Sequence, residues 1–248
     1  MMTTDKKFHF ISGLPRSGST LLSSILNQNP KFSAGISSAL LQFIKGYIDA
    51  ITSNSSLTLH ISNEKLKDLI IDLFYSYYKN DNQVCFNTNR GWTSEVPLIK
   101  DVFPDSKMIV CMRSVPWILD SFERLQRKNP YTLKPIYNEV DLLNVYGRSH
   151  ALMGNNPNMV GQVSEPLSCL QDLVYSEEGK SALYINYNSI AQHPKEVMKL
   201  VYEYLEEDYY EHDFNAVGAN YDVVDNTLKT KGLHTVRNTV SFNKRKTI

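Results

Sequence analysis

Several features that would narrow the function at once are scarce in this 248-residue chain. It has three cysteines, an odd number without metal-type spacing, and Cys85 and Cys111 lie in apolar, strand-like runs where a buried thiol is expected. Twenty-six basic and twenty-six acidic residues cancel, so no overall charge favours nucleic acid or an anionic membrane. No apolar run approaches the roughly 20 residues of a membrane span, and no apolar signal region precedes the first strand. We therefore expect a cytoplasmic protein with no metal site that binds neither nucleic acid nor membrane.

One absence is more specific, and it lies in residues 11–22, Ile-Ser-Gly-Leu-Pro-Arg-Ser-Gly-Ser-Thr-Leu-Leu. Gly13 and Gly18 have the spacing of a phosphate-binding loop between a strand and a helix, but Ser19 stands where such a loop carries lysine. The only cation in the loop is Arg16. Backbone N–H groups at the helix N-terminus can still hold an anion, whereas the lysine that ATP-dependent phosphoryl transfer uses is missing. The loop predicts a nucleotide that carries some other transferable group.

Strand and helix patterns alternate along the chain. Apolar strand patterns cover residues 8–12, 83–87, 107–112 and 182–186. Helical patterns cover residues 19–29, 37–52, 62–79, 97–102, 118–127, 139–153, 167–175 and 194–205. This alternation predicts an α/β fold, a P-loop-like three-layer, doubly wound parallel sheet flanked by helices. We expect one domain over residues 1–248, with its core at about 8–206 and an irregular tail at about 207–248.

A second anion site is predicted at the end of the strand over residues 107–112. In Mg-dependent nucleotide hydrolases, an apolar strand near the phosphate loop ends in Asp, which helps to hold the metal. Here the strand ends in Arg113, and a guanidinium binds phosphate directly, without metal. Ser121 lies eight residues later on the next helix, from which its hydroxyl can reach the same anion. Ligands of such sheets lie beyond the strand ends, so the two sites indicate a nucleotide with phosphate groups at both its 5′ and 3′ ends.

The loop Gly13-Leu-Pro-Arg-Ser-Gly-Ser-Thr20 and the strand–Arg113–Ser121 element resemble the 5′- and 3′-phosphate motifs of the sulfotransferase family. The resemblance extends over about residues 8–206. It includes residues 98–107, Leu-Ile-Lys-Asp-Val-Phe-Pro-Asp-Ser-Lys, and residues 185–190, Ile-Asn-Tyr-Asn-Ser-Ile, where the family usually has Arg-Tyr-Glu-x-Leu. The order and spacing resemble tyrosylprotein and bacterial small-molecule sulfotransferases more than animal cytosolic ones. The Leu-Pro-Arg-Ser-Gly-Ser-Thr loop is most similar to cyanobacterial enzymes that tailor alkaloid toxins of the saxitoxin type.

This resemblance implies a co-substrate and a role for each matching residue. The sulfuryl donor would be 3′-phosphoadenosine 5′-phosphosulfate (PAPS), the product adenosine 3′,5′-bisphosphate (PAP), and no metal would be needed. Arg16 matches the catalytic cation, which stabilises the charge that builds on the departing phosphate. The 3′-phosphate would be held by Arg113 and Ser121, with Tyr187 near the nucleotide. The residues around the 5′-phosphosulfate would be Arg16, Ser17, Gly18, Ser19, Thr20 and Leu21.

The late glycine-rich phosphate loop of the family is not present in its usual form. The nearest substitute is Lys231-Gly-Leu-His-Thr-Val-Arg237, which makes His234 and Arg237 further candidates for binding the 3′-phosphate. The glutamate base of the tyrosylprotein enzymes is also missing, because residues 33–39 contain no acid. A peptide tyrosine acceptor is therefore disfavoured, and a small-molecule acceptor is expected.

Two residues on the acceptor side each have two interpretations. Arg90 either faces the sulfuryl group, where relatives carry a lysine, or is a solvated loop residue; Glu95 is either the general base or an ordinary acid at a helix N-terminus. Residues 35–43 and 131–154 are expected to shape the acceptor pocket. A saxitoxin-like guanidinium acceptor could be met by one of four acids: Glu95, Asp101, Asp141 or Glu165.

The sequence thus predicts transfer of a sulfuryl group from PAPS to a hydroxyl or nitrogen of a small molecule, in secondary metabolism such as toxin biosynthesis. Two rival functions are a P-loop nucleotide kinase with a degenerate loop and a catalytically silent nucleotide-binding module. Metal dependence and transfer to an acceptor distinguish the three.

Overall fold

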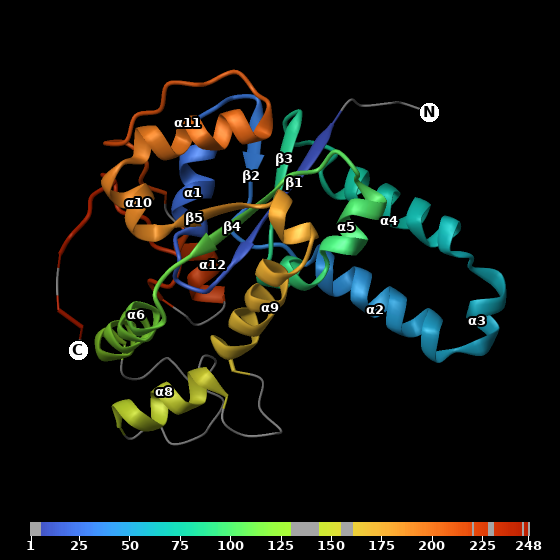
Figure 1. The fold of residues 1–248 in the computed structure, drawn as a ribbon, viewed down its shortest axis with the longest axis horizontal. Helices are drawn as coiled ribbons and strands as arrows, with labels where there is room; N and C mark the ends of the chain where they lie inside the picture. The colour runs from blue at the N-terminus through green and yellow to red at the C-terminus, as the bar shows by residue number, and fades with distance from the viewer. Residues whose placement is uncertain are drawn as a thin grey trace.

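Five parallel strands form one sheet in the computed structural model, which describes residues 6–129, 144–154, 161–219, 221–227, 231–244 and 246–247. The strand order is β2-β3-β1-β4-β5, so β1 is the central strand of the sheet (Figure 1). The strands are β1 (Lys7–Gly13), β2 (Phe32–Ala34), β3 (Val84–Thr88), β4 (Met108–Met112) and β5 (Leu183–Asn186). All pairs are parallel, so the carboxyl ends of β1, β3 and β4 lie at one edge. The predicted single-domain, doubly wound α/β fold is confirmed.

Helices cover both faces of the sheet (Figure 1). Side chains of α1 and α11 pack on one face, and side chains of α2, α4, α5, α6 and α9 pack on the other. The helices are α1 (Ser19–Leu26), α2 (Leu40–Ser53), α3 (Ser55–His60), α4 (Asn63–Tyr77), α5 (Val96–Val102), α6 (Val115–Lys128), α8 (Val145–Met153), α9 (Ser164–Tyr175), α10 (Tyr187–Gln192), α11 (Pro194–Leu205) and α12 (Asp222–Thr227), with short 3-10 turns η1 (Arg90–Ser94) and η2 (Glu178–Ser181). Within the described residues, every helix falls short of the length and apolarity that crossing a membrane requires.

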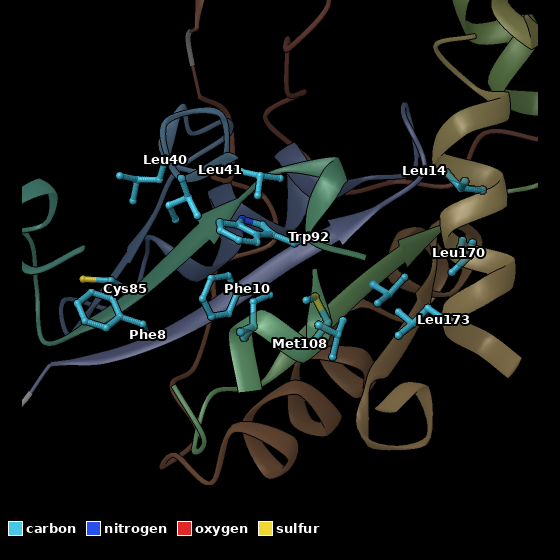
Figure 2. Close-up of a cluster of buried hydrophobic side chains, with 14 of the residues drawn as sticks. Phe8, Phe10, Leu14, Leu40, Leu41, Cys85, Trp92, Met108, Leu170 and Leu173 are labelled. Carbon is cyan, nitrogen blue, oxygen red and sulfur yellow. The ribbon is translucent and has the colours of Figure 1, made fainter. Parts of the chain in front are cut away.

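Alternation along β1 builds the two cores. Phe8 and Phe10 point to the face covered by α2 and α4, where Phe10 makes an edge contact of 4.9 Å between ring centroids with Trp92 (Figure 2). Ile11 belongs to the opposite core, with Leu22 of α1. Trp92 is 1% exposed and donates from Nε1 to Asn87 Oδ1 at 2.8 Å, so it is a core residue. The aromatic core fixes β1, from which the phosphate loop leaves.

Besides the two 3-10 turns, four short elements were not predicted: β2, α3, α10, and α12 in the tail expected to be irregular. The strand β2 has only three residues, too few for an alternating pattern, and it exists because it pairs with β3. The helix α3 has no buried residue, and α10 follows β5 directly through a cap in which Asn186 accepts from the backbone N–H of Asn188. The first part of the helix predicted over 139–153 lies outside the described residues, and the remainder is α8.

The side chain of Asp120 on α6 is buried, with 1% of its surface exposed. It accepts from Arg124 Nε at 2.9 Å, one helical turn away on α6, and this pairing offsets the cost of burying the carboxylate.

Candidate functional site

The phosphate loop leaves the sheet between the ends of β1 and β4. Gly13 pairs with Cys111 of β4, and its φ of 113° lies in the left-handed region that favours glycine. A Cβ at Gly13 would lie 2.1 Å from the Cys111 carbonyl oxygen. The next backbone N–H, that of Leu14, donates to the same carbonyl at 2.9 Å. Gly13, the first glycine of the motif, is therefore required because the backbones of β1 and β4 approach closely there. Its conformation sets the direction in which the loop leaves the sheet.

The loop then turns into α1 through two residues with positive φ. Arg16 has φ 56° and Gly18, which caps the helix, has φ 100°. Ser17 is buried and its hydroxyl donates to the Leu14 carbonyl, which closes the turn. Ser19 begins α1, and the N–H groups of a helix's first turn have no partner within the helix. The loop and this helix end can therefore receive an anion.

The two predicted anion sites touch each other. Arg113 follows β4 and donates from Nη1 to the backbone carbonyl of Arg16 at 3.0 Å. Its guanidinium lies 4.1 Å from the ring centroid of Tyr187, a distance at which a cation is attracted to an aromatic face. Tyr187 also packs against the loop, since a Cβ at Gly18 would lie 3.0 Å from its ring. The ends of β1, β4 and β5 thus form one structural unit.

The side chain of Arg16 links this unit to α6 and to the tail. Its Nε donates to Ser121 Oγ at 3.0 Å, and its Nη1 donates to the carbonyl of Leu233. The loop cation, the α6 hydroxyl and the segment 231–244 therefore meet at one point.

A cavity of about 920 Å³ opens at this point. Most of the residues predicted for the site line it, but Ser17 and Glu95 do not. The predicted residues that line the cavity are Arg16, Gly18, Ser19, Thr20, Leu21, Arg90, Arg113, Ser121, Tyr187, His234 and Arg237.

Sequence reasoning missed further lining residues on α6. Trp117, Arg124 and Lys128 line the cavity together with Ser121. Their spacing of three or four residues places them on one helix face, and this signal was available once Ser121 was singled out. Gln162 also lines the cavity but carries no signal in sequence.

The lining is strongly basic. Eight Arg and Lys side chains contribute to it, although the whole chain has no net charge. The described lining residues include no Asp or Glu. The basic residues are Arg16, Arg90, Arg113, Arg124, Lys128, Lys231, Arg237 and Lys244. Such a local cluster suits a ligand with several negative charges.

The sequence model of the sulfotransferase family matches residues 9–211, which include the phosphate loop, Arg113, Ser121 and Tyr187. The chain belongs to this family. The resemblance predicted from the two motifs is confirmed.

Known relatives agree with this assignment. A Caenorhabditis briggsae protein named "Putative protein-tyrosine sulfotransferase" is 22% identical over 250 residues, which cover 94% of this chain and 81% of that protein. The sulfotransferase domain from the curacin biosynthetic pathway superposes with a TM-score of 0.52 at 16% identity, covering 83% of this chain and 75% of that domain. A sulfotransferase from Alicyclobacillus acidocaldarius gives 0.51 at 15% identity, covering 90% and 89%. At such identities the structural likeness shows a shared fold.

Arg90 and Glu95, the two residues of this sulfotransferase predicted for the acceptor side, lie in different surroundings. Arg90 follows β3, is exposed, lines the cavity, and donates from Nη1 to Gln162 Oε1 at 3.4 Å. Glu95 instead forms an ion pair with Lys45 of α2 at 2.7 Å and accepts from the Ser94 hydroxyl at 3.1 Å. Glu95 is therefore not brought to the cavity with the other predicted residues.

His234 is held by a partner that the sequence did not reveal. Its Nδ1 lies 2.6 Å from Oδ1 of Asp225 on α12, and its backbone N–H lies 3.1 Å from Oδ2 of the same carboxylate. Arg237 is exposed beside it in the lining.

Other reactive groups lie apart from the cavity. Burial lowers the pKa of His9 to about 4, so this imidazole is neutral, and its Nδ1 accepts from the backbone N–H of Lys107 at 3.1 Å. Burial raises the pKa of Cys85 to about 11 and that of Cys111 to about 12, which keeps both thiols protonated. Among the described residues, no three His, Cys, Asp or Glu side chains gather as a metal site would require.

Proposed function

We propose that this sulfotransferase transfers a sulfuryl group from PAPS to a hydroxyl or nitrogen of a small-molecule acceptor and releases PAP. The observation that carries the proposal is the convergence of Arg16 and Arg113 on one cavity. A doubly phosphorylated adenosine needs two cationic sites at its ends, and the loop end and the β4 end supply them at neighbouring strands.

The fit of the donor follows from the residues in place. The backbone of residues 17–20 and the Arg16 guanidinium would hold the 5′-phosphosulfate at the start of α1. Arg113 and Ser121 would hold the 3′-phosphate, and the Arg113–Tyr187 stack fixes the guanidinium plane. Trp117, one turn before Ser121, offers an aromatic face to the base. The remaining cations of the lining would reduce the repulsion between the phosphate groups.

The reaction exchanges the S–O bond of the donor for an S–O or S–N bond to the acceptor. The acceptor oxygen or nitrogen forms a bond to sulfur and releases its proton to water, while the bond between sulfur and the 5′-phosphate oxygen breaks and its electron pair stays on that phosphate. Arg16 stabilises the resulting charge, and the fixed loop costs no reorganisation at that moment. Positioning by the loop supplies much of the remaining acceleration. Glu95 was a candidate for the base that takes the acceptor proton. Its ion pair with Lys45 does not support that role.

The strand order supports a place for the acceptor in this proposal. A nucleotide held from β4 to β1 would direct its sulfuryl group toward β3 and β2, on the other side of β1. Residues on that side line the cavity from the segment predicted for the acceptor, namely Ile36, Ser37 and Gln42. Arg90 after β3 lies there too, where it can face the sulfuryl group. The second predicted segment, 131–154, is described only over residues 144–154.

A saxitoxin-like guanidinium acceptor, and with it a role in toxin biosynthesis, rests on the resemblance of the loop. The described lining does not support it, because Glu95 pairs with Lys45, Asp101 pairs with Lys67, and Glu165 is not a lining residue. Asp141 lies outside the described residues.

The compartment proposed for the enzyme is the cytoplasm. The free thiols of all three cysteines support this proposal.

One assay tests the function. The enzyme is incubated with labelled PAPS and a panel of hydroxyl and amine acceptors, including a guanidinium alkaloid, in EDTA. We expect a labelled acceptor and stoichiometric PAP, with turnover reduced at least about 100-fold in Arg16→Ala, the range for removal of one transition-state donor. A parallel incubation replaces PAPS and EDTA by ATP and Mg²⁺, and turnover there without any transfer from PAPS would support the kinase. PAP binding without transfer to any acceptor would support the silent module.

A further inference from the structure

A buried carboxylate lies next to the cavity on α12. Asp225 is 1% exposed, and the group that faces its carboxylate is His234 of the lining, through both the ring Nδ1 at 2.6 Å and the backbone N–H at 3.1 Å. A buried carboxylate is costly unless charged or hydrogen-bonding groups compensate it. Two contacts to one residue fix both the ring and the backbone of that residue.

The residue before His234 holds the catalytic cation. The carbonyl of Leu233 accepts from Arg16 Nη1, while Ser121 accepts from Arg16 Nε at 3.0 Å. An arginine side chain loses rotamer entropy when it is fixed. The Leu233 carbonyl helps to fix it only if that carbonyl is itself held in place.

The segment around Leu233 is anchored to two helices of the core. Asn129, which caps α6, donates to the Lys231 carbonyl at 3.1 Å, and Tyr221, just before α12, lies 3.3 Å from the Ser24 hydroxyl of α1. Directly after Lys231, Gly232 turns the chain with φ 82°, and the Leu233 side chain packs against the core. Asp225 adds a polar contact one residue from Leu233, through the backbone N–H of His234.

We propose that Asp225 is a positioning residue for catalysis: it fixes His234 so that the Leu233 carbonyl orients the Arg16 guanidinium toward the 5′-phosphate. This inference rests on the proposed function, because it acts through the role of Arg16 there. It assigns to α12, within the tail that the sequence predicted as irregular, a task in assembling the donor site.

A double-mutant cycle on PAP affinity tests this link without an identified acceptor. Calorimetry would compare wild type, Asp225→Asn, Arg16→Ala and the double variant. We expect Asp225→Asn to weaken PAP binding about tenfold, and the double variant to bind PAP as Arg16→Ala does, within about twofold. Residues that act through one another are non-additive, whereas independent effects multiply. Glu211→Gln, which removes the charge of an exposed partner of Lys195, is the control and should leave PAP binding unchanged.

Unchanged or tighter PAP binding by Asp225→Asn, or multiplied losses in the double variant, would overturn the inference alone. Wild type that fails to bind PAP would overturn the proposed function and this inference with it. If Asp225→Asn does not fold, the cycle is run with Asp225→Ser, which keeps a hydrogen-bond acceptor without charge. Failure of both variants to fold would make Asp225 a folding residue and reject the positioning role.

Discussion

At the scale of single residues, Arg113 would contribute to the proposed donor site twice. Its guanidinium stacks on Tyr187 at 4.1 Å, and its Nη1 donates to the backbone carbonyl of Arg16. A cation fixed in this way would bind a phosphate with little loss of entropy, and it also supports the loop proposed to bind the other phosphate.

Arg113→Ala should weaken PAP binding by about 1.5–3 kcal/mol, the range for hydrogen bonds to charged groups, which is roughly 10- to 150-fold. Isothermal titration measures the change. Arg127→Ala, which removes an exposed cation of α6 outside the cavity lining, is the matched control and should bind PAP normally. Equal affinity of Arg113→Ala and wild type would refute the assignment of the 3′-phosphate to this residue.

Residues close together in sequence were predictable and distant partners were not. The loop residues Arg16 and Gly18 follow a motif whose spacing fixes their geometry, so they could be placed before the fold was known. Asp225 could not, because it meets His234 only through α12, in a polar stretch without periodicity. For Glu95 the sequence left two interpretations open, and it could not show that α2 brings Lys45 to this carboxylate.

At the scale of elements, the junction of β1 with the loop should tolerate no side chain at Gly13. Gly13→Ala combines a φ of 113° with a Cβ 2.1 Å from the Cys111 carbonyl, so we expect a loss of at least about 2 kcal/mol in the free energy of unfolding. Gly46→Ala is the matched control: it lies inside α2 with no atom within 4 Å of its added Cβ, and should stabilise by about 0.5–1 kcal/mol. Urea unfolding followed by circular dichroism measures both. A tolerated Gly13→Ala would contradict the close approach of β1 and β4.

The attachment of α8 to α6 should depend on pH. Glu123 of α6 is 7% exposed and accepts from Arg148 of α8 at 2.8 Å, and its hydrogen bonds to Arg148 and to Arg127 lower its pKa from the ordinary 4.5. A lowered folded-state pKa gives stability that is present above about pH 4.5 and is lost as the pH falls through the folded-state value. Glu123→Gln should therefore cost about 1–3 kcal/mol at pH 7 and progressively less below pH 4.5.

Unfolding curves of wild type and Glu123→Gln between pH 7 and pH 3 check this dependence. Glu177→Gln, in an exposed pair with Lys180, should cost less than about 0.5 kcal/mol at any of these pH values. A cost of Glu123→Gln that stays constant down to pH 3 would rule out the ionised carboxylate as its origin.

Long elements were predicted more accurately than short ones. The helix α11 occupies the whole predicted range 194–205, because its apolar residues repeat at helical spacing over three turns. The strand β2 forms because it pairs with β3, and α10 begins directly after the last residue of β5. Tertiary contacts rather than local sequence therefore decide both elements. The cavity lies where the four predicted strands end, so its position could be predicted. On the acceptor side, Arg90 and residues of the segment 35–43 were predicted to line it, whereas Gln162 was not.

At the scale of the whole molecule, a ligand that joins β1, β4, α6 and the tail should stabilise the entire fold. At 100 times its dissociation constant, PAP should add about 2.7 kcal/mol, which is roughly 5–10 °C in Tm for a chain of this length. AMP, which lacks the 3′-phosphate, should give a smaller shift at the same concentration. Thermal unfolding with each nucleotide in EDTA measures this, and equal shifts for PAP and AMP would leave Arg113 and Ser121 without their proposed ligand.

The contact between Arg16 and the Leu233 carbonyl joins the start of the chain to a segment more than 200 residues later. During synthesis on a ribosome, the loop emerges long before residues 231–244, which complete the lining of the cavity. A newly made chain can therefore pair its five strands before the cavity at their carboxyl ends is complete.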